Sequence, residues 1–203
     1  KPVTLPASKS ISNRILILEA LSEKKIKMVN LSAADDTVEL QNALKETSKN
    51  IYAGNGGTTF RFLLSYLASK KGKWFLDCGE QMKNRPIKSL VDAWKQLGVK
   101  IIYKGKNGFP PIEIHGGTIL KNKVKVNANE SSQFVSSLLL VAPFLKNSLE
   151  ISISKNVVSQ SYISMTLEML KSFGVNFTKK KDKIIISNGI KWPKSFAVEP
   201  DWS

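Results

Sequence analysis

Residues 87–99, IKSLVDAWKQLGV, carry the pattern that decides the fold. Pro86 suits the first position of a helix, and Gly98 suits the position just after its end. The stretch therefore predicts a helix that packs one face against a core and is followed by a strand. Apolar side chains recur at the spacing of one helix face, at Ile87, Leu90, Val91, Trp94 and Leu97.

The same pattern returns at residues 163–175, ISMTLEMLKSFGV. Gly98 and Gly174 lie 76 positions apart, and the apolar positions 87, 91 and 94 match 163, 167 and 170 at that offset. Each copy belongs to a series of helix, strand, helix, strand, strand, and the first 55 residues predict a third copy without its hairpin. The alternation predicts an α/β domain in which three similar units pack their apolar helix faces together.

The rest of the chain also contains patterns that predict helices and strands. Helices are also expected to open at Asp35 and at Ser131/Ser132. Further helices are expected over residues 12–21 and 58–69, and strands over 27–31, 51–53, 74–78, 99–103, 112–115, 149–153, 175–178 and 183–187.

The composition indicates a soluble globular protein with anionic partners. The 203 residues carry a net charge of +15, much of it as scattered lysines, and residues 179–181 (KKK) predict a solvated hairpin tip. The longest apolar run, Leu138 to Leu145, is too short to cross a membrane. The single cysteine, Cys78, predicts a buried thiol in a reducing compartment, and we expect a cytoplasmic location.

A glycine-rich loop, residues 53–61 (AGNGGTTFR), precedes an apolar helix that is expected to begin near Thr58. Glycine lets backbone N–H groups turn inward, and the helix start adds free N–H donors and the positive end of its dipole. Such a loop can bind phosphate or carboxylate. Taken alone, the loop is more typical of a tight turn with a threonine cap.

Other predicted helix starts carry similar chemistry, which favours the anion site. Most offer hydroxyl groups or small residues, and some add a Lys or Arg that can bind carboxylate or phosphate. A single serine is usually a helix cap, but five such starts in one domain predict a polyanionic ligand. These starts are residues 8–14, 56–59, 84–86, 131–133 and 159–162.

At these positions the chain resembles the N-terminal half of the 5-enolpyruvylshikimate-3-phosphate synthase family. The matching motifs are residues 5–14 (LPASKSISNR), 35–37 (DDT), 54–58 (GNGGT), 85–87 (RPI) and 131–134 (SSQF), with Ser159 and Tyr162. The resemblance implies an α/β fold, with one domain of the enolpyruvyl transferase fold built from three βαβαββ units as an inverse α/β barrel.

The resemblance also implies that about half of an enzyme is present. Residues 1–11 would belong to or border the second domain, residues 12–197 would form the substrate-binding domain, and residues 198–203 would begin the crossover to the second domain. The acid and base carboxylates of the family lie in that second domain. We therefore expect this chain to bind substrate as a monomer and to be inactive alone.

The family transfers the enolpyruvyl group of phosphoenolpyruvate to the 5-hydroxyl of shikimate 3-phosphate and releases phosphate, a step of chorismate and aromatic amino acid biosynthesis. The resemblance implies no metal and no organic cofactor. It gives Lys9 a catalytic position between the two substrates, where its charge would offset theirs.

The other roles are carried over residue by residue. By resemblance, Ser10 and Arg14 would hold the shikimate carboxylate, and Gln133 would lie against the ring. Three serines would bind the 3-phosphate beside Tyr162, namely Ser131, Ser132 and Ser159. Phosphoenolpyruvate would meet Gly57 and Arg85, Thr58 would support that loop, and Asn55 is counted with the substrate-binding residues. Gly57 would also leave room for the inhibitor glyphosate.

Two alternatives remain open at the level of sequence. One is a half of the enolpyruvyl transferase that acts on UDP-N-acetylglucosamine, although Lys9, Ser10 and residues 131–133 favour the shikimate substrate. The other is a basic RNA-binding α/β module, because a charge of +15 supplies affinity for phosphate. The aromatic residues mostly fit core faces, so we expect neither a nucleic acid nor a membrane partner.

Overall fold

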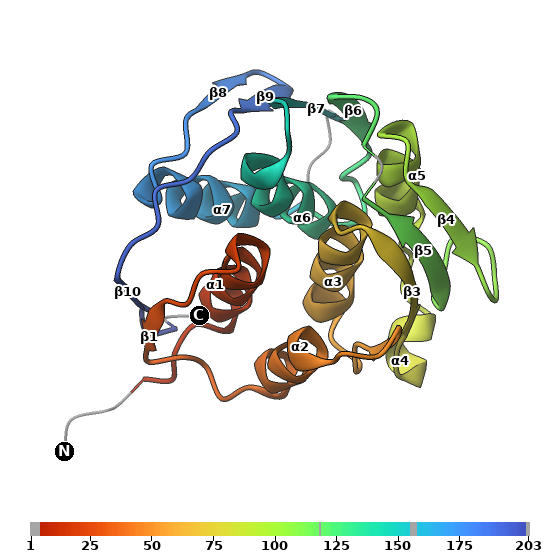
Figure 1. Cartoon of the computed structure of the whole chain (residues 1–203), viewed down its shortest axis with the longest axis horizontal. Helices are drawn as coiled ribbons and strands as arrows, with labels where there is room; N and C mark the ends of the chain where they lie inside the picture. The colour runs from red at the N-terminus through yellow and green to blue at the C-terminus, as the bar shows by residue number, and fades with distance from the viewer. Residues whose placement is uncertain (1–4, 118, 155–157, 202–203) are drawn as a thin grey trace.

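A computed structural model describes residues 5–117, 119–154 and 158–201 (Figure 1). The helices are α1 (Lys9–Ser22), α2 (Asp35–Lys45), α3 (Gly57–Ser69), α4 (Glu80–Lys83), α5 (Lys88–Gln96), α6 (Gln133–Val141) and α7 (Gln160–Ser172), with a 3₁₀ turn at Ala142–Phe144. The strands are β1 (Lys27–Val29), β2 (Asn50–Tyr52), β3 (Gly72–Asp77), β4 (Lys100–Tyr103), β5 (Ile112–Gly116), β6 (Lys123–Val126), β7 (Leu149–Ile153), β8 (Phe177–Lys180), β9 (Lys183–Ile186) and β10 (Ser195–Ala197).

The strands form separate sheets that lie around the outside of the molecule, with the helices between them (Figure 1). Two sheets have four strands and the same topology, in the orders β2-β3-β5-β4 and β6-β7-β9-β8. In both, the first two strands are parallel and the last two form an antiparallel hairpin. The predicted inverse α/β barrel of repeated units is the fold observed.

The third unit is assembled from both ends of the chain. Strand β10 pairs in parallel with β1, as β2 pairs with β3 and β6 with β7, and α1 and α2 complete the unit. This sheet has only the two strands within the described residues, so the predicted lack of a hairpin is confirmed. The predicted bounds of the copy, the first 55 residues, are wrong, because β10 comes from the other end of the chain and β2 belongs to the next sheet. The end segments also run side by side, because the Ser8 N–H donates to the Glu199 carbonyl at 2.9 Å and the Asp201 N–H to that of Pro6 at 2.7 Å.

The centre of the core is formed by the first helix of each unit, α1, α3 and α6. Residues 134–141 of α6 are all buried, as expected for a helix that is mostly apolar and carries only two small polar residues, Ser136 and Ser137, in this stretch. A short chain of buried hydrogen bonds crosses this core. Trp94 Nε1 donates to Ser65 Oγ at 2.9 Å, and Ser65 Oγ donates to Ser137 Oγ at 2.9 Å.

Two helix starts differ from the sequence prediction. Helix α1 begins at Lys9 instead of residue 12, so Lys9 and Ser10 lie in its first turn. Helix α5 begins at Lys88, and Pro86 is therefore not its first residue. Ile87 has a non-helical backbone, with φ −131° and ψ 3°, and its N–H donates to the Gly108 carbonyl at 2.9 Å. The chain is therefore non-helical for two residues longer than predicted.

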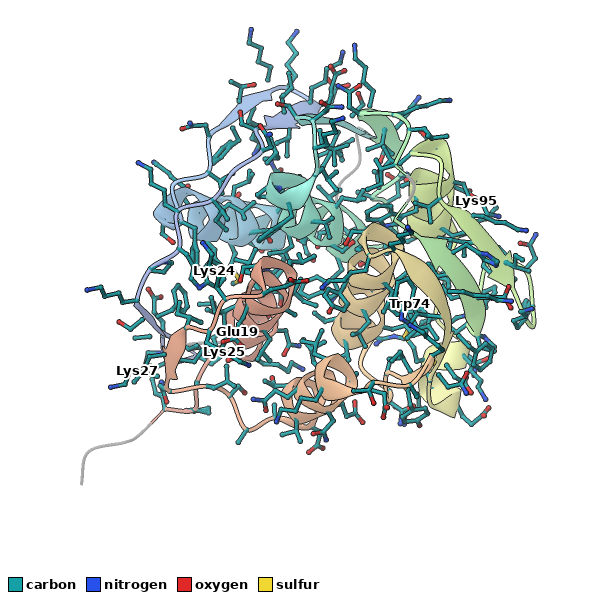
Figure 2. All side chains as sticks on the ribbon, in the orientation of Figure 1. Glu19, Lys24, Lys25, Lys27, Trp74 and Lys95 are labelled. Atoms are coloured by element: carbon teal, nitrogen blue, oxygen red, sulfur yellow. The ribbon has the colours of Figure 1, made fainter. Side chains whose placement is uncertain are left out.

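The positive charge is spread over the whole surface. Lys27 and Lys95 lie at opposite edges of the molecule in Figure 2. Lys181 forms the exposed turn between β8 and β9, which confirms the predicted hairpin tip. Among the described residues no helix has the length and apolar character needed to cross a membrane.

Candidate functional site

A cavity of about 320 Å³ opens where several helices begin. Its lining comes from α3, the segment before α5, the start of α6 and the start of α7. Six of its ten residues were predicted as site residues from the sequence, and four were not, namely Arg61, Pro86, Glu130 and Val158. The predicted members are Arg85, Ser131, Ser132, Gln133, Ser159 and Tyr162.

Contacts between neighbouring helix starts connect all three units. Asp36 on α2 pairs with Lys9 on α1 and, through its carbonyl, accepts a hydrogen bond of 2.9 Å from Thr59 Oγ1 on α3. Arg61 on α3 reaches Gln133 at the start of α6. Arg14 on α1 reaches the Tyr162 carbonyl in the first turn of α7 at 3.2 Å. The beginnings of these helices, with their positive dipole ends, therefore gather in one region.

The serines at these starts do not act as ordinary caps. Ser8, Ser132 and Ser159 occupy the N-cap positions of α1, α6 and α7, yet none makes a side-chain capping bond within the described residues. Ser131 is the exception, because its Oγ accepts from the Gln133 N–H at 3.2 Å. Ser132 and Ser159 both line the cavity, Ser159 as an exposed residue and Ser132 with only 3% of its surface exposed.

Arg14 is buried, with 1% of its surface exposed, and does not line the cavity. Its Nε donates to Thr166 Oγ1 at 2.8 Å, and its Nη1 donates to the Ser10 carbonyl at 2.7 Å. A further bond of 3.4 Å reaches Ser136. Burial lowers the pKa of the guanidinium to about 10. Arg14 therefore joins α1, α6 and α7 and leaves a positive charge inside the protein.

Lys9 lies beside the glycine loop and also outside the cavity. Its Nζ is 3.1 Å from Asp36 Oδ2, and 48% of the Lys9 side chain is exposed. Asp36 also faces the loop, since a Cβ built on Gly56 would lie 2.9 Å from Asp36 Cγ. The predicted catalytic lysine is thus held by a carboxylate to which the sequence prediction gave no chemical role.

The glycine loop meets charges of opposite sign at its two ends. The Glu39 carboxylate packs against Gly54 and accepts a hydrogen bond from the Asn55 backbone, while desolvation and the nearby Asp36 raise the pKa of Glu39. At the other end, a Cβ on Gly57 would lie 2.5 Å from Arg85 Nη1 and 2.9 Å from an Arg61 nitrogen. Only the Gly57 end is therefore suited to an anion.

The remaining predicted residues, Thr58 and Asn55, lie outside the cavity lining. Thr58 accepts a hydrogen bond of 2.6 Å from Gln133 Nε2, so the loop is joined directly to the start of α6. The Asn55 side chain instead packs against Gly79, away from the cavity. The missed residue Arg61 had a readable signal, because a lone charge between Phe60 and Phe62 is unusual in an apolar helix.

Acidic and thiol groups within the described residues do not form a metal site. No group of three or more His, Cys, Asp or Glu side chains is arranged there to hold a metal ion. Burial raises the pKa of the Cys78 thiol to about 12, which agrees with the predicted buried structural thiol.

Comparison with known proteins adds a second line of information. The profile of the family described as EPSP synthase (3-phosphoshikimate 1-carboxyvinyltransferase) matches residues 41–203. A 3-phosphoshikimate 1-carboxyvinyltransferase of Bacteroides fragilis is 40% identical over 202 residues, which cover 99% of this chain and 49% of the relative. One from Buchnera aphidicola is 36% identical over an alignment of 231 residues that spans 99% of this chain and 53% of the relative.

The same likeness holds for the fold. An EPSP synthase structure from Acinetobacter baumannii superimposes with a TM-score of 0.79 at 21% identity, covering 98% of this chain and 49% of that one. The chain spans about half the length of the curated relatives it matches. Matches of this extent and identity show that the chain belongs to the EPSP synthase (3-phosphoshikimate 1-carboxyvinyltransferase) family.

Proposed function

We propose that this chain is the shikimate 3-phosphate-binding half of an enzyme that transfers the enolpyruvyl group of phosphoenolpyruvate to shikimate 3-phosphate. The observation that carries the proposal is the cavity where two guanidinium groups and three serines meet at helix starts. Arg61 and Arg85 outnumber the single carboxylate there, Glu130, so the cavity favours an anionic ligand.

In this proposal the phosphate of the ligand lies among the serines. The hydroxyls of Ser131, Ser132 and Ser159 donate to phosphate oxygens, and the starts of α6 and α7 add their dipoles. Tyr162 closes the same wall, and Gln133 lies beside the sugar-like ring. The volume of about 320 Å³ suits a small ligand of this kind.

The carboxylate end of the ligand is assigned to the Ser10 region of α1. Arg14 is buried and already bonded to the Ser10 and Tyr162 carbonyls, so its part is to fix these two segments and to supply a field that favours a negative charge. Ser10 lies in the first helical turn, where its hydroxyl and the free N–H groups are available to a carboxylate.

Phosphoenolpyruvate is assigned to the space between Arg85 and Lys9. Arg85 is exposed at Gly57 and can bind phosphate or carboxylate bidentately, while the Lys9 ammonium offsets the joint charge of the two substrates. Transfer forms a C–O bond to the 5-hydroxyl and breaks the C–O bond to phosphate. The acid and base carboxylates would come from the second domain, which makes this half inactive alone.

A reconstitution assay tests the proposal. The chain is mixed with the second half of the Bacteroides fragilis relative, complex formation is checked by size-exclusion chromatography, and phosphate release is measured with both substrates. We expect release that needs both halves and is lost in Lys9→Met. A folded complex that binds both substrates and releases no phosphate would contradict the proposal.

A further inference from the structure

Arg61 is a charged side chain placed inside the protein at the wall of the cavity. Only 7% of its surface is exposed, and burial, followed by the nearby charge of Arg85, lowers its pKa to about 10. Among the described residues it forms no ion pair within 4.0 Å, and its Nε is buried without a hydrogen-bond partner. Glu130, in the same cavity, attracts the Arg61 charge only from beyond ion-pair distance. A buried charge without a close counter-ion is costly, which suggests that this position serves the site more than the stability of the fold.

The first contact of Arg61 determines the orientation of the Gln133 amide. Arg61 Nη1 lies 2.6 Å from Gln133 Oε1. Because a guanidinium can only donate, the Gln133 atom facing it must be the carbonyl oxygen. The amide nitrogen is then turned toward Thr58, whose Oγ1 accepts from it at 2.6 Å. Only one of the two flipped orientations of Gln133 satisfies both neighbours.

The second contact of Arg61 reaches the segment that carries Arg85. Arg61 Nη2 donates to the Pro86 carbonyl at 3.2 Å, one residue after Arg85. The guanidinium groups of Arg61 and Arg85 also approach Gly57 together. In addition, the guanidinium carbon of Arg61 lies 5.1 Å from the centre of the Phe134 ring. This cation–π contact favours one orientation of the guanidinium group. One side chain thus touches the glycine loop, the Arg85 segment and the start of α6.

We propose that Arg61 is a positioning residue, which fixes the Gln133 amide and the Arg85 segment so that the cavity has its binding geometry before a ligand arrives. The role needs a planar fork with donors that point in two fixed directions. A lysine would keep the charge but could not hold Gln133 Oε1 and the Pro86 carbonyl in the same geometry. The expected effect of Arg61 on the binding of shikimate 3-phosphate rests on the proposed function, whereas its effect on the orientation of the Gln133 amide does not.

The ligand-free test uses the side-chain amide of Gln133 in ¹⁵N-labelled chain. Its two N–H signals are assigned as those lost in Gln133→Ala. In the wild type we expect them to be displaced from free-glutamine positions and slow to exchange with water. In Arg61→Lys they should move to the free-glutamine region, while Lys95→Met, a surface cation over Tyr103, should leave them unchanged. Unchanged Gln133 signals in a folded Arg61→Lys protein would overturn the proposal.

If Arg61→Lys does not fold, Arg61→Gln replaces it, because this variant removes the buried charge and retains a polar side chain. Backbone amide spectra show whether each variant is folded. Failure of both variants to fold would also overturn the proposal, since Arg61 would then be needed for the fold itself.

The ligand test is a double-mutant cycle measured by calorimetry with shikimate 3-phosphate. Arg61→Lys and Gln133→Ala should each weaken binding by about tenfold, the value of one hydrogen bond to a charged group, and the double variant by little more than Gln133→Ala alone. Fully additive losses would show that Arg61 acts directly on the ligand and would overturn the positioning role. A wild type that gives no binding heat would count against the proposed function, and the Gln133 signals would still decide the role of Arg61.

Discussion

Lys9 Nζ lies 3.1 Å from Asp36 Oδ2, so the lysine assigned to the substrates is paired with a carboxylate from the neighbouring helix. The pair joins the first turns of α1 and α2 beside the glycine loop. Both side chains are partly exposed, at 48% for Lys9 and 27% for Asp36, which limits the strength of their attraction. An anionic ligand that recruits Lys9 must compete with Asp36.

Asp36→Asn should therefore strengthen the binding of shikimate 3-phosphate. An exposed ion pair contributes up to about 1 kcal/mol, so we expect an increase in affinity of up to about fivefold. Calorimetry measures the change, with Asp35→Asn as the control because Asp35 carries the same charge in the same turn and forms no ion pair with Lys9. Weaker binding by Asp36→Asn would mean that the carboxylate holds Lys9 in its active position.

Gly57→Ala should displace the Arg85 side chain without unfolding the protein. A Cβ at this position would lie 2.5 Å from Arg85 Nη1 and 2.9 Å from Arg61 Nη1, both too close for a real contact. The exposed Arg85 side chain can move away, and the end of the Arg61 side chain needs only a small shift. The Nε–H signal of Arg85 in a ¹⁵N spectrum should shift, and the melting temperature should change little. Gly105→Ala is the matched control, since its nearest neighbour, Pro111 Cδ, is 3.5 Å away. An unmoved Arg85 signal would contradict the predicted clash.

Ser65→Ala should destabilise the core by about 1–3 kcal/mol, because it leaves the buried Trp94 N–H without an acceptor. The free energy of unfolding from urea titration measures the loss. Ser69→Ala removes a hydroxyl from the same helix, where Ser69 Oγ donates only to the Tyr66 carbonyl near the surface, and should have a smaller effect. Equal losses would show that the hydrogen-bond chain through Ser65 adds no stability of its own.

The pH dependence of stability should contain a contribution from Glu113. Hydrogen bonds from Lys104 and His115, with Lys73 close by, lower its pKa from 4.5 to about 2 in the folded chain. A lowered pKa means that the stabilisation is complete above about pH 4.5 and is lost as the pH falls toward 2.

Melting temperatures of the wild type and Glu113→Gln should accordingly differ at pH 6 and converge as the pH approaches 2. Glu168→Gln is the control, because Glu168 is exposed and forms no ion pair among the described residues. A difference between the wild type and Glu113→Gln that stays constant from pH 6 to pH 2 would show that the ion pairs of Glu113 do not stabilise the fold.

The fold was predictable where local sequence patterns repeat, and hard to predict where strands that pair lie far apart in the sequence. The two copies around Gly98 and Gly174 predicted the helices and hairpins, because helix periodicity and glycine caps are local signals. Strand β10 was missed, since its partner β1 lies near the other end of the chain. Strand β6 was also missed, although its sequence KVKV alternates as a strand does. At the free edge of β6, the Gln96 side-chain amide forms two hydrogen bonds with the Lys125 backbone, and this contact was not predicted.

The site was predictable in residue type and less so in contacts. Helix starts rich in Ser, Gly and Arg indicated an anion site, and six predicted residues line the cavity. The sequence could not show that Arg14 is buried, that Glu39 uses the Asn55 N–H, or that Arg61 fixes Gln133. These contacts join side chains from different repeats, so they depend on packing that no local pattern records.

The most direct test of the anion site is calorimetry of the isolated chain with shikimate 3-phosphate and, in parallel, with shikimate. We predict saturable binding of the phosphorylated compound, weakened at least about tenfold when the phosphate is absent, because charge-assisted hydrogen bonds to that group are lost. Ser132→Ala should weaken the binding of shikimate 3-phosphate and leave that of shikimate unchanged. A folded chain that binds both compounds equally, or neither, would contradict the account.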